Sequence, residues 1–296
     1  MRLAHLYRLI LKHGIEADPR KDKVSIRSFS DSAILYGDPG IEVTSVLVGI
    51  DIEVPEIILA DRLREAQGVD MVFAHHPGGG AYAALYEVLQ LQVDLLTQAG
   101  VPQKVAEAFL EERKREVERK ILPANHMRSV DAARLLNIPF VCAHTPADNQ
   151  AHQFINRLLL KERPPTLEHI VRLLMNIPEY AEAARNNAGP RVILGNPRRT
   201  VGKWFVEMTG GTEGHKDVYD KLYKTGVRTI ISMHLGEDHF KKAKDAGLNV
   251  VIAGHISSDT LGLNLLLDKI ENEEKLDIIC CSGFRRFRRS KGSKGM

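Results

Sequence analysis

Short apolar runs rich in Val and Ile alternate along the chain with longer stretches whose apolar residues recur at helical spacing. This alternation is typical of βαβ units that build a largely parallel sheet, so the expected fold class is α/β. The short runs predict strands over Val43–Ile50, Asp70–Ala74, Ile138–Ala143, Arg191–Leu194, Trp204–Met208, Val227–Met233, Asn249–Ala253 and Leu276–Cys281. The longer stretches predict helices over Pro55–Gln67, Ala81–Ala99, Val130–Leu136, Gln150–Lys161, His215–Lys224, Asp238–Ala246 and Asp259–Asn272.

Two further segments have a helical pattern of a different kind. The first twenty residues predict an amphipathic helix, and they lack the small-residue cleavage site of a signal peptide. The segment Val101–Lys120 is dense in Glu, Arg and Lys and has few apolar positions in its second half. It predicts a protruding, solvated helix or helical hairpin with charge pairs four residues apart. A partner-binding arm is the alternative interpretation.

Helix-breaking residues indicate where the chain divides. Pro164-Pro165 interrupts the pattern once, and the Asn-Asn and Gly-Pro pairs between residues 181 and 190 interrupt it again. We place the boundary near residue 165. The prediction is an N-terminal α/β domain over residues 1–165, with a helical insertion near 101–120. A C-terminal α/β domain over 166–296 ends in a basic tail at 285–296.

Length and composition describe a globular protein. The 296 residues suffice to bury a core in one large domain or two medium ones. No window approaches the ~18 consecutive apolar residues of a membrane helix, so we expect no membrane partner. The three cysteines, Cys142, Cys280 and Cys281, form neither a disulfide framework nor a CxxC motif. This pattern suits a reducing compartment and predicts a cytoplasmic protein.

The net charge of +3 comes from one end of the chain. Six cationic side chains lie in the tail, and removing them from +3 leaves about −3 for the rest: Arg285, Arg286, Arg288, Arg289, Lys291 and Lys294. The favoured interpretation is a solvated, frayed terminus. An arm that contacts nucleic-acid phosphates is the alternative, but the sequence contains no recognised nucleic-acid motif, so no nucleic-acid partner is expected.

Four apolar strands end at a histidine, and two of these histidines are followed by an aspartate four residues later. The segments are VDMVFAHH (His75, His76), IPFVCAHTPAD (His144, Asp148), VRTIISMH (His234) and NVVIAGHISSD (His255, Asp259). The carboxyl ends of strands form the binding crevice of open α/β sheets, so we expect these side chains to share one rim.

Imidazole and carboxylate groups in such a crevice point to metal ligation, and they suit Zn, Fe, Mn, Ni or Co. Adjacent side chains of an extended segment point apart, so His75 and His76 could serve two ions ~3.5–4 Å apart, as in dinuclear hydrolases. Asp148 and Asp259 could instead cap the helices that follow them. Together with the histidines, we favour ligation. His144 could bind a metal directly or orient a ligand, and the two roles are left open.

Other residues have weaker signals. His234 and His239 flank a turn and could reach the rim, but a surface helix start is the default interpretation. The glycines after the paired histidines, Gly78, Gly79 and Gly80, form a possible anion loop, although they lack the spacing of known phosphate loops. A second glycine-rich loop spans residues 209–214. No Ser-His-Asp or Cys-His nucleophile is suggested.

The ordered motifs AHHP, AHTPAD and AGH with an acid four residues later resemble those of the NGG-one-interacting-factor-three family, the Nif-three-like proteins. The resemblance extends from about Val43 to Leu267. It implies two related α/β domains, a dinuclear metal site in the cleft between them, and ring-shaped homo-oligomers, often hexamers. By position, the family's metal ligands fall on His75, His76, His144, Asp148, His255 and Asp259. A further family histidine falls on His239.

The chain departs from the family pattern in three places. The last acid of the family is usually Glu, and Asp259 is shorter by one methylene. Gly78–Gly80 replace the usual Leu-Ile-Phe after the paired histidines. The interval from His76 to His144 is longer than in compact members, which fits an insertion at 101–120.

The sequence supports two hypotheses of function. The first is a metal-dependent hydrolase that acts on a small substrate, a nucleotide or a phosphorylated molecule among the candidates. Family members carry GTP cyclohydrolase-like annotations. In this hypothesis a metal-bound water is the nucleophile and His144 is a candidate orienter, but no catalytic side chain can be assigned. The second is a non-catalytic metal-binding scaffold or regulatory interaction protein.

Overall fold

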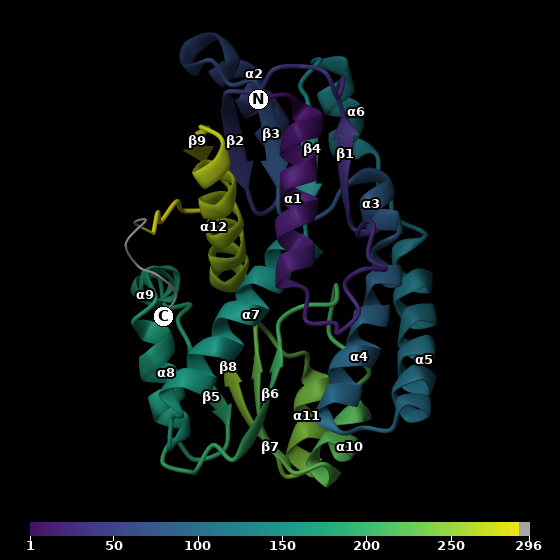
Figure 1. Cartoon of the computed structure of the whole chain (residues 1–296), viewed down its shortest axis with the longest axis vertical. Coiled ribbons are helices and arrows are strands. Elements are labelled where there is room, and N and C mark those ends of the chain that lie inside the picture. The colour runs from purple at the N-terminus through teal and green to yellow at the C-terminus, as the bar shows by residue number, and fades with distance from the viewer. Residues whose placement is uncertain (290–296) are drawn as a thin grey trace.

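The fold contains two β-sheets, one in each half of the molecule along its long axis (Figure 1). The structure is a computed structural model, and it describes residues 1–289. The first sheet contains β1 (Ser32–Tyr36), β2 (Ser45–Gly49), β3 (Met71–Ala74), β4 (Phe140–Ala143) and β9 (Asp277–Cys280) in the order β1-β4-β3-β2-β9. The second contains β5 (Arg191–Leu194), β6 (Lys203–Glu207), β7 (Val227–Ser232) and β8 (Asn249–Ile252) in the order β5-β8-β7-β6.

The two sheets share one topology. In each, the first strand lies antiparallel at one edge beside the fourth, and the third and second strands continue the sheet in parallel. The first sheet adds β9, which pairs in parallel with β2. The predicted α/β class and the relatedness of the two units are therefore confirmed, and all eight predicted strands are present. Strand β1 was not predicted.

Helices cover both faces of each sheet, which explains the continuous apolar runs of the strands. In β2, Val46 and Val48 face one core with α1 (Leu3–Ala17) and α12 (His255–Glu273). Leu47 faces the other core with α2 (Val54–Gln67), α3 (Gly79–Ala83) and α6 (Arg128–Leu135). This alternation is the two-residue period of a strand buried on both sides.

The second sheet is covered in the same way. One core lies between its strands and α7 (Thr145–Glu162), α8 (Leu167–Met175) and α9 (Pro178–Arg185). The other face packs against α4 (Gln90–Ala99), α5 (Gln103–Ile121), α10 (Val218–Lys224) and α11 (Glu237–Asp245). Among the described residues, none of these helices combines the length and apolar character needed to cross a membrane.

Sheet membership does not follow a single division of the chain near residue 165. The second sheet begins at Arg191, after the predicted boundary, but α4 and α5 precede the boundary and pack on the second sheet. Strand β9 lies at the other end of the chain and returns to the first sheet. The chain therefore crosses between the two units more than once.

Several predicted helices begin or divide elsewhere. The predicted helix Ala81–Ala99 is three pieces, α3, a 3₁₀ turn at Leu85–Leu89, and α4. Helix α7 begins at Thr145 rather than Gln150, because Pro146 is tolerated in a first turn. Helix α12 begins at His255 rather than Asp259. These two earlier starts place Asp148 in the first turn of α7 and Asp259 at the fifth residue of α12. Helices α8 and α9 were not predicted.

The segment predicted to protrude, Val101–Lys120, is one helix, α5, that is buried along one face. Ala106, Leu110, Val117 and Ile121 pack into the core with α4. The sparse apolar positions are enough because they fall on a single stripe. The predicted charge pairs are present on the exposed face, for example Arg115 with Glu111 at 3.0 Å. The prediction of a helix with charge pairs is therefore confirmed, but the prediction that this helix protrudes into solvent was wrong.

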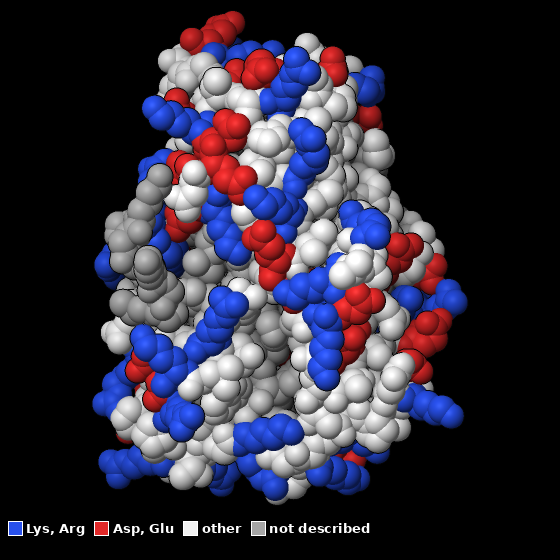
Figure 2. All heavy atoms as spheres, viewed as in Figure 1, with Lys and Arg blue, Asp and Glu red and all other residues white. Residues whose placement is uncertain are grey.

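The prediction of a frayed basic tail was also wrong for residues 285–289. The Arg286 side chain is 5% exposed, and its guanidinium forms ion pairs with Asp268 and Glu271. Arg289 donates two hydrogen bonds of 2.9 Å to the buried carboxylate of Glu179. These contacts dock the segment on α12 and α9. Lys291 and Lys294 lie outside the described residues. On the face in Figure 2, Lys and Arg side chains are interspersed with Asp and Glu side chains.

The docked arginine generates a stability prediction. Arg286→Ala should lower the free energy of unfolding by about 2 kcal/mol, because Asp268 and Glu271 lose their most buried cationic partner and keep only Arg288 and Arg289. Urea denaturation followed by circular dichroism measures the change. Arg288→Ala is the matched control, since Arg288 contacts the same Glu271 but is 59% exposed. Equal denaturation midpoints for the two variants would show that burial of the Arg286 pair contributes nothing.

Candidate metal centre

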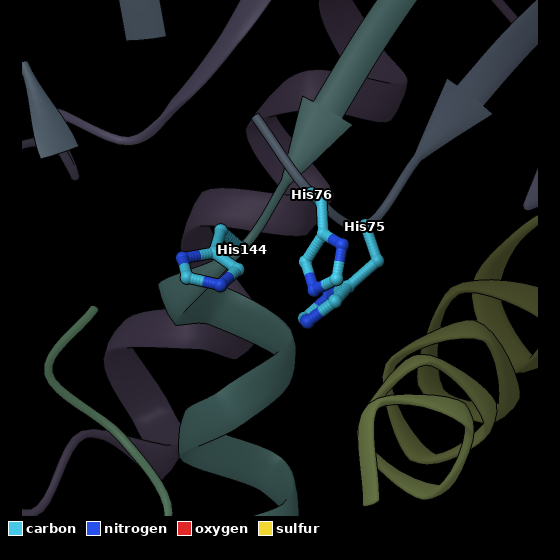
Figure 3. Close-up of side chains that lie close together, drawn as sticks. All are labelled: His75, His76 and His144. Carbon is cyan, nitrogen blue, oxygen red and sulfur yellow. The ribbon is translucent and has the colours of Figure 1, made fainter. Parts of the chain in front are cut away.

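The six predicted ligand residues converge between the carboxyl ends of strands and the first turns of two helices. His75 and His76 follow β3, and His144 joins β4 to α7. His255 is the first residue of α12, after β8 of the second sheet. The rings of His75, His76 and His144 lie close together beside the start of α7 (Figure 3). We call the six residues the His/Asp cluster: His75, His76, His144, Asp148, His255 and Asp259.

Helices α7 and α12 contribute to the cluster in equivalent ways. Each begins at a histidine or directly after one, and each holds an aspartate four residues after that histidine, at Asp148 and Asp259. These carboxylates are 5% and 1% exposed. The positive end of the helix dipole favours the carboxylate of Asp148 in the first turn of α7. Because α7 packs against α12, the two aspartates face one space.

The ligand atoms form three groups in which all atoms lie within 4.8 Å of one another. The groups are His75 with His76 and His144, His76 with His255 and Asp259, and His75 with Asp148 and Asp259. The first group offers imidazole donors only, and the other two combine imidazole and carboxylate donors. Divalent transition metals bind both kinds of donor. These His/Asp groups could therefore hold metal ions.

Asp259 connects two of these groups through its two oxygens. Its Oδ1 lies 3.5 Å from Nε2 of His75. Its Oδ2 lies 3.4 Å from Nε2 of His76 and 3.5 Å from Nε2 of His255. The same Nε2 of His75 also lies 3.4 Å from Oδ1 of Asp148. One carboxylate thus spans two sets of donors.

These distances fit ligands that share an ion better than they fit hydrogen bonds. Charge-assisted N–H···O bonds are usually about 2.7–2.9 Å long. Two donors that each lie about 2.0–2.1 Å from a tetrahedral ion are roughly 3.4 Å apart. In addition, His75 Nε2, Asp148 Oδ1 and Asp259 Oδ2 are buried and have no hydrogen-bond partner. Buried polar atoms are rarely left without one, so their convergence is the property expected of a cation site.

The other ring nitrogens are held by partners behind the cluster. Nδ1 of His76 lies 2.7 Å from Oδ1 of Asp51, and Nδ1 of His144 lies 2.9 Å from Oδ2 of Asp31. Nδ1 of His75 lies 3.3 Å from the carbonyl oxygen of Ala143. A proton on each Nδ1 donates to these oxygens and leaves the Nε2 lone pair directed at the cluster. This arrangement is characteristic of metal-binding histidines.

The charges of the cluster are strongly coupled. Burial by itself lowers the pKa of His75, but the carboxylates of Asp259 and Asp148 outweigh it and raise the pKa to about 10. Burial alone would raise the pKa of Asp259, yet the neighbouring His75 and His76 hold it well below its ordinary value. Burial and the surrounding histidines lower the pKa of His255 despite the attraction of Asp259. Without a metal, the carboxylates therefore need a proton on His75 to offset their charge.

Two histidines that follow β7 differ in how close they lie to the His/Asp cluster. The ring of His234 lies 4.7 Å from that of His255, and its Nδ1 lies 3.1 Å from Glu213. His239, which the family resemblance selected, is buried and bonded to the carbonyl of Gly214 at 2.9 Å. It belongs to none of the three groups above. His234 is thus the histidine beside the cluster.

A cavity of about 560 Å³ opens beside the cluster and is lined by both units. His76 and His144 line it from the first unit, and His234, His255 and Thr212 from the second. Gly78 also lines the cavity, but the Gly79 amide donates to the carbonyl of His126 at 2.9 Å. At least one amide of the predicted anion loop is therefore engaged within the protein, and anion binding by Gly78, Gly79 and Gly80 stays a prediction.

Sequence reasoning missed the residues that orient the rings. Asp51 directly follows the predicted strand Val43–Ile50, so the strand-end rule that selected the histidines would also have selected it. Asp31 precedes β1, an edge strand whose short mixed pattern gave no signal. Glu213 lies in the second glycine-rich loop and is identified only by its contact with His234.

Comparison with solved structures places this architecture among known folds. A NIF3 superfamily protein from Sphaerobacter thermophilus is 27% identical, with 94% of this chain and 98% of that chain covered and a TM-score of 0.77. HcgD from Methanocaldococcus jannaschii is 16% identical, with coverages of 95% and 97% and a TM-score of 0.57. A hypothetical protein from Staphylococcus aureus is 14% identical, with coverages of 98% and 99% and a TM-score of 0.52.

Neither a protein-family model nor a curated protein matches the chain. The two more distant structures share the fold alone. The Sphaerobacter thermophilus protein matches almost the full length at higher identity, and the motifs that carried the resemblance here lie in the His/Asp cluster. The resemblance to NIF3-like proteins predicted from those motifs is confirmed by this match.

Proposed function

We propose that the His/Asp cluster holds two divalent metal ions and that the protein is a metal-dependent hydrolase of small molecules. The observation that carries the proposal is the position of Asp259. Its Oδ1 lies 3.5 Å from Nε2 of His75, and its Oδ2 lies 3.4–3.5 Å from Nε2 of His76 and of His255. The two oxygens thus approach different donors, as those of a carboxylate that bridges two ions would. Three buried ligand atoms without hydrogen-bond partners support it.

The donors divide into two sets. His75, Asp148 and one oxygen of Asp259 would hold the first ion, and His144 would join them or orient Asp148, whose Oδ2 lies 3.8 Å from its Nε2. His76, His255 and the other oxygen of Asp259 would hold the second. Nitrogen and oxygen donors of this kind suit Zn, Fe, Mn, Ni or Co.

The cavity favours an enzyme over a non-catalytic metal-binding scaffold. Two ions supply Lewis acidity, which lowers the pKa of water and polarises a carbonyl or phosphoryl group. The cavity volume of about 560 Å³ is in the range of small-molecule sites. Imidazoles of His76, His144 and His255 line it, so a bound substrate would lie against the cluster. The predicted ring-shaped homo-oligomer and cytoplasmic location stay predictions.

Metal content tests the bridging carboxylate. We expect about two ions per chain in the wild type, about one in His255→Ala, and almost none in Asp259→Asn, since both donor sets include Asp259. Elemental analysis of purified full-length protein gives the stoichiometry and the identity of the metal. His5→Ala, outside the cluster, is the control and should keep both ions. An Asp259→Asn variant that keeps two ions would rule out the bridging role.

The support behind His144 gives a second prediction. Asp31 is fully buried and accepts hydrogen bonds from His144 Nδ1 at 2.9 Å and from the Thr145 hydroxyl at 2.7 Å. Asp31→Asn should weaken metal affinity by about 10–100-fold, as loss of such partners does in other sites. Competition with a fluorescent chelator measures the affinity, and Asp38→Asn in an exposed turn is the control. Unchanged affinity in a folded Asp31→Asn protein would show that Asp31 does not support metal binding through His144.

Hydrolysis is tested on a panel of nucleotides, GTP included, and other phosphoesters. The wild type should turn over at least one member, and His75→Ala, which loses a donor of the first ion, should reduce kcat by a factor of about 100 or more. Product release is followed chromatographically, with His5→Ala as the control. A protein that binds two metal ions but hydrolyses nothing on the panel would contradict the hydrolase and favour the scaffold.

A further inference from the structure

One wall of the cavity beside the His/Asp cluster carries a group of residues with no assigned role. It comes from the loop before α6 and the first turn of that helix, and it consists of Asn125, His126, Arg128 and Ser129. The hydrogen bond from the Gly79 amide to the His126 carbonyl ties this wall to the segment that follows His76. The wall and the cluster therefore face the same space from connected segments.

Arg128 is the only Lys or Arg among the residues that line this cavity. It is exposed, and within residues 1–289 it makes neither an ion pair nor a side-chain hydrogen bond. Arg134, on the same helix, is paired with Asp131 at 3.2 Å. An arginine that lines a cavity without a protein partner has its planar set of donors available for an anion.

Ser129 provides a second, independent observation. It is 9% exposed and lines the cavity, and its hydroxyl has no hydrogen-bond partner within the described chain. A Cβ at Gly78 would lie 3.4 Å from Ser129 Oγ, so the glycine leaves space beside the hydroxyl. The first-turn amides of α6 lack acceptors within the helix. Hydroxyl, amides and guanidinium thus form a set of donors at a helix N-terminus, which favours negative charge.

The acidic residues of the cavity are engaged elsewhere. Asp51 lies 2.7 Å from Nδ1 of His76. The Glu53 side chain accepts from the backbone in the capping box that starts α2. Within the described residues, neither carboxylate forms an ion pair with Arg128.

We propose that the first turn of α6, through Arg128 and Ser129, is a phosphate-binding subsite and that the natural substrate is a small phosphorylated molecule. The phosphate is bound at this wall and the bond to be cleaved lies against the His/Asp cluster. The placement of the bond to be cleaved against the His/Asp cluster rests on the proposed function. The phosphate subsite itself does not, because its donors are separate from the ligand groups.

Calorimetric titration of the full-length protein with inorganic phosphate tests the subsite without any turnover. Arg128→Ala should weaken phosphate binding by roughly tenfold to a hundredfold, the range for hydrogen bonds to charged groups. Ser129→Ala should weaken it by a smaller factor. Arg134→Ala is the matched control on the same helix and should bind like the wild type. Arg128 is exposed, so its variants are expected to fold, and circular dichroism checks this.

The outcomes separate this inference from the proposed function when metal content is measured on the same samples. Equal phosphate affinity in Arg128→Ala and Arg134→Ala, or no binding to the wild type at millimolar phosphate, overturns the subsite even if two metals are bound. Arg128-dependent phosphate binding in a protein that holds no metal supports the subsite and removes the hydrolase. Binding that weakens in Arg128→Ala while the metal content stays at two supports both.

Discussion

The packing of α7 against α12 is the constraint on which the rest of the structure depends. Each helix starts where a parallel strand ends, so each brings one histidine and one aspartate to the site near its N-terminal end. Only because the two starts face each other do Asp148 and Asp259 share the nitrogen of His75. Two buried carboxylates that approach the same nitrogen repel each other. Within the described chain, the surrounding imidazoles are the groups that can offset their negative charge. The proposed cations would remove the conflict.

The repeated topology explains how this geometry arises from a chain with little internal sequence repetition. Both sheets place their fourth strand between an antiparallel edge strand and the third strand. Consequently the carboxyl ends of β3 and β4 in the first sheet occupy the same topological positions as those of β7 and β8 in the second sheet. His144 and His255 are then equivalent in position, as are His76 and His234. Only the first unit has a second histidine, His75, and it lies at the centre of the cluster.

Patterns along the chain predicted what depends on local chemistry. Apolar runs predicted eight strands, and the signal was clearest for β2, β3, β4 and β7, which are buried along nearly their whole length. Strand-end histidines found the cluster because parallel strands converge at one rim. The pattern could not show that α5 packs against α4 and the second sheet, because the sparse apolar stripe of a helix does not indicate which element it contacts. It also missed Asp31, because an edge strand with mixed side chains has no distinctive period. The docking of Arg286 depends on residues of α12 that no local rule relates to it.

The position of β9 has a consequence for how the protein is made. This strand is the last in sequence, yet it covers the edge of β2 in the first sheet. During synthesis the edge of β2 therefore stays unpaired until the second unit and β9 have left the ribosome. Exposed strand edges recruit other strands, and folding intermediates with such edges aggregate. A nascent chain of this topology has reason to depend on chaperones until its final strand closes the sheet.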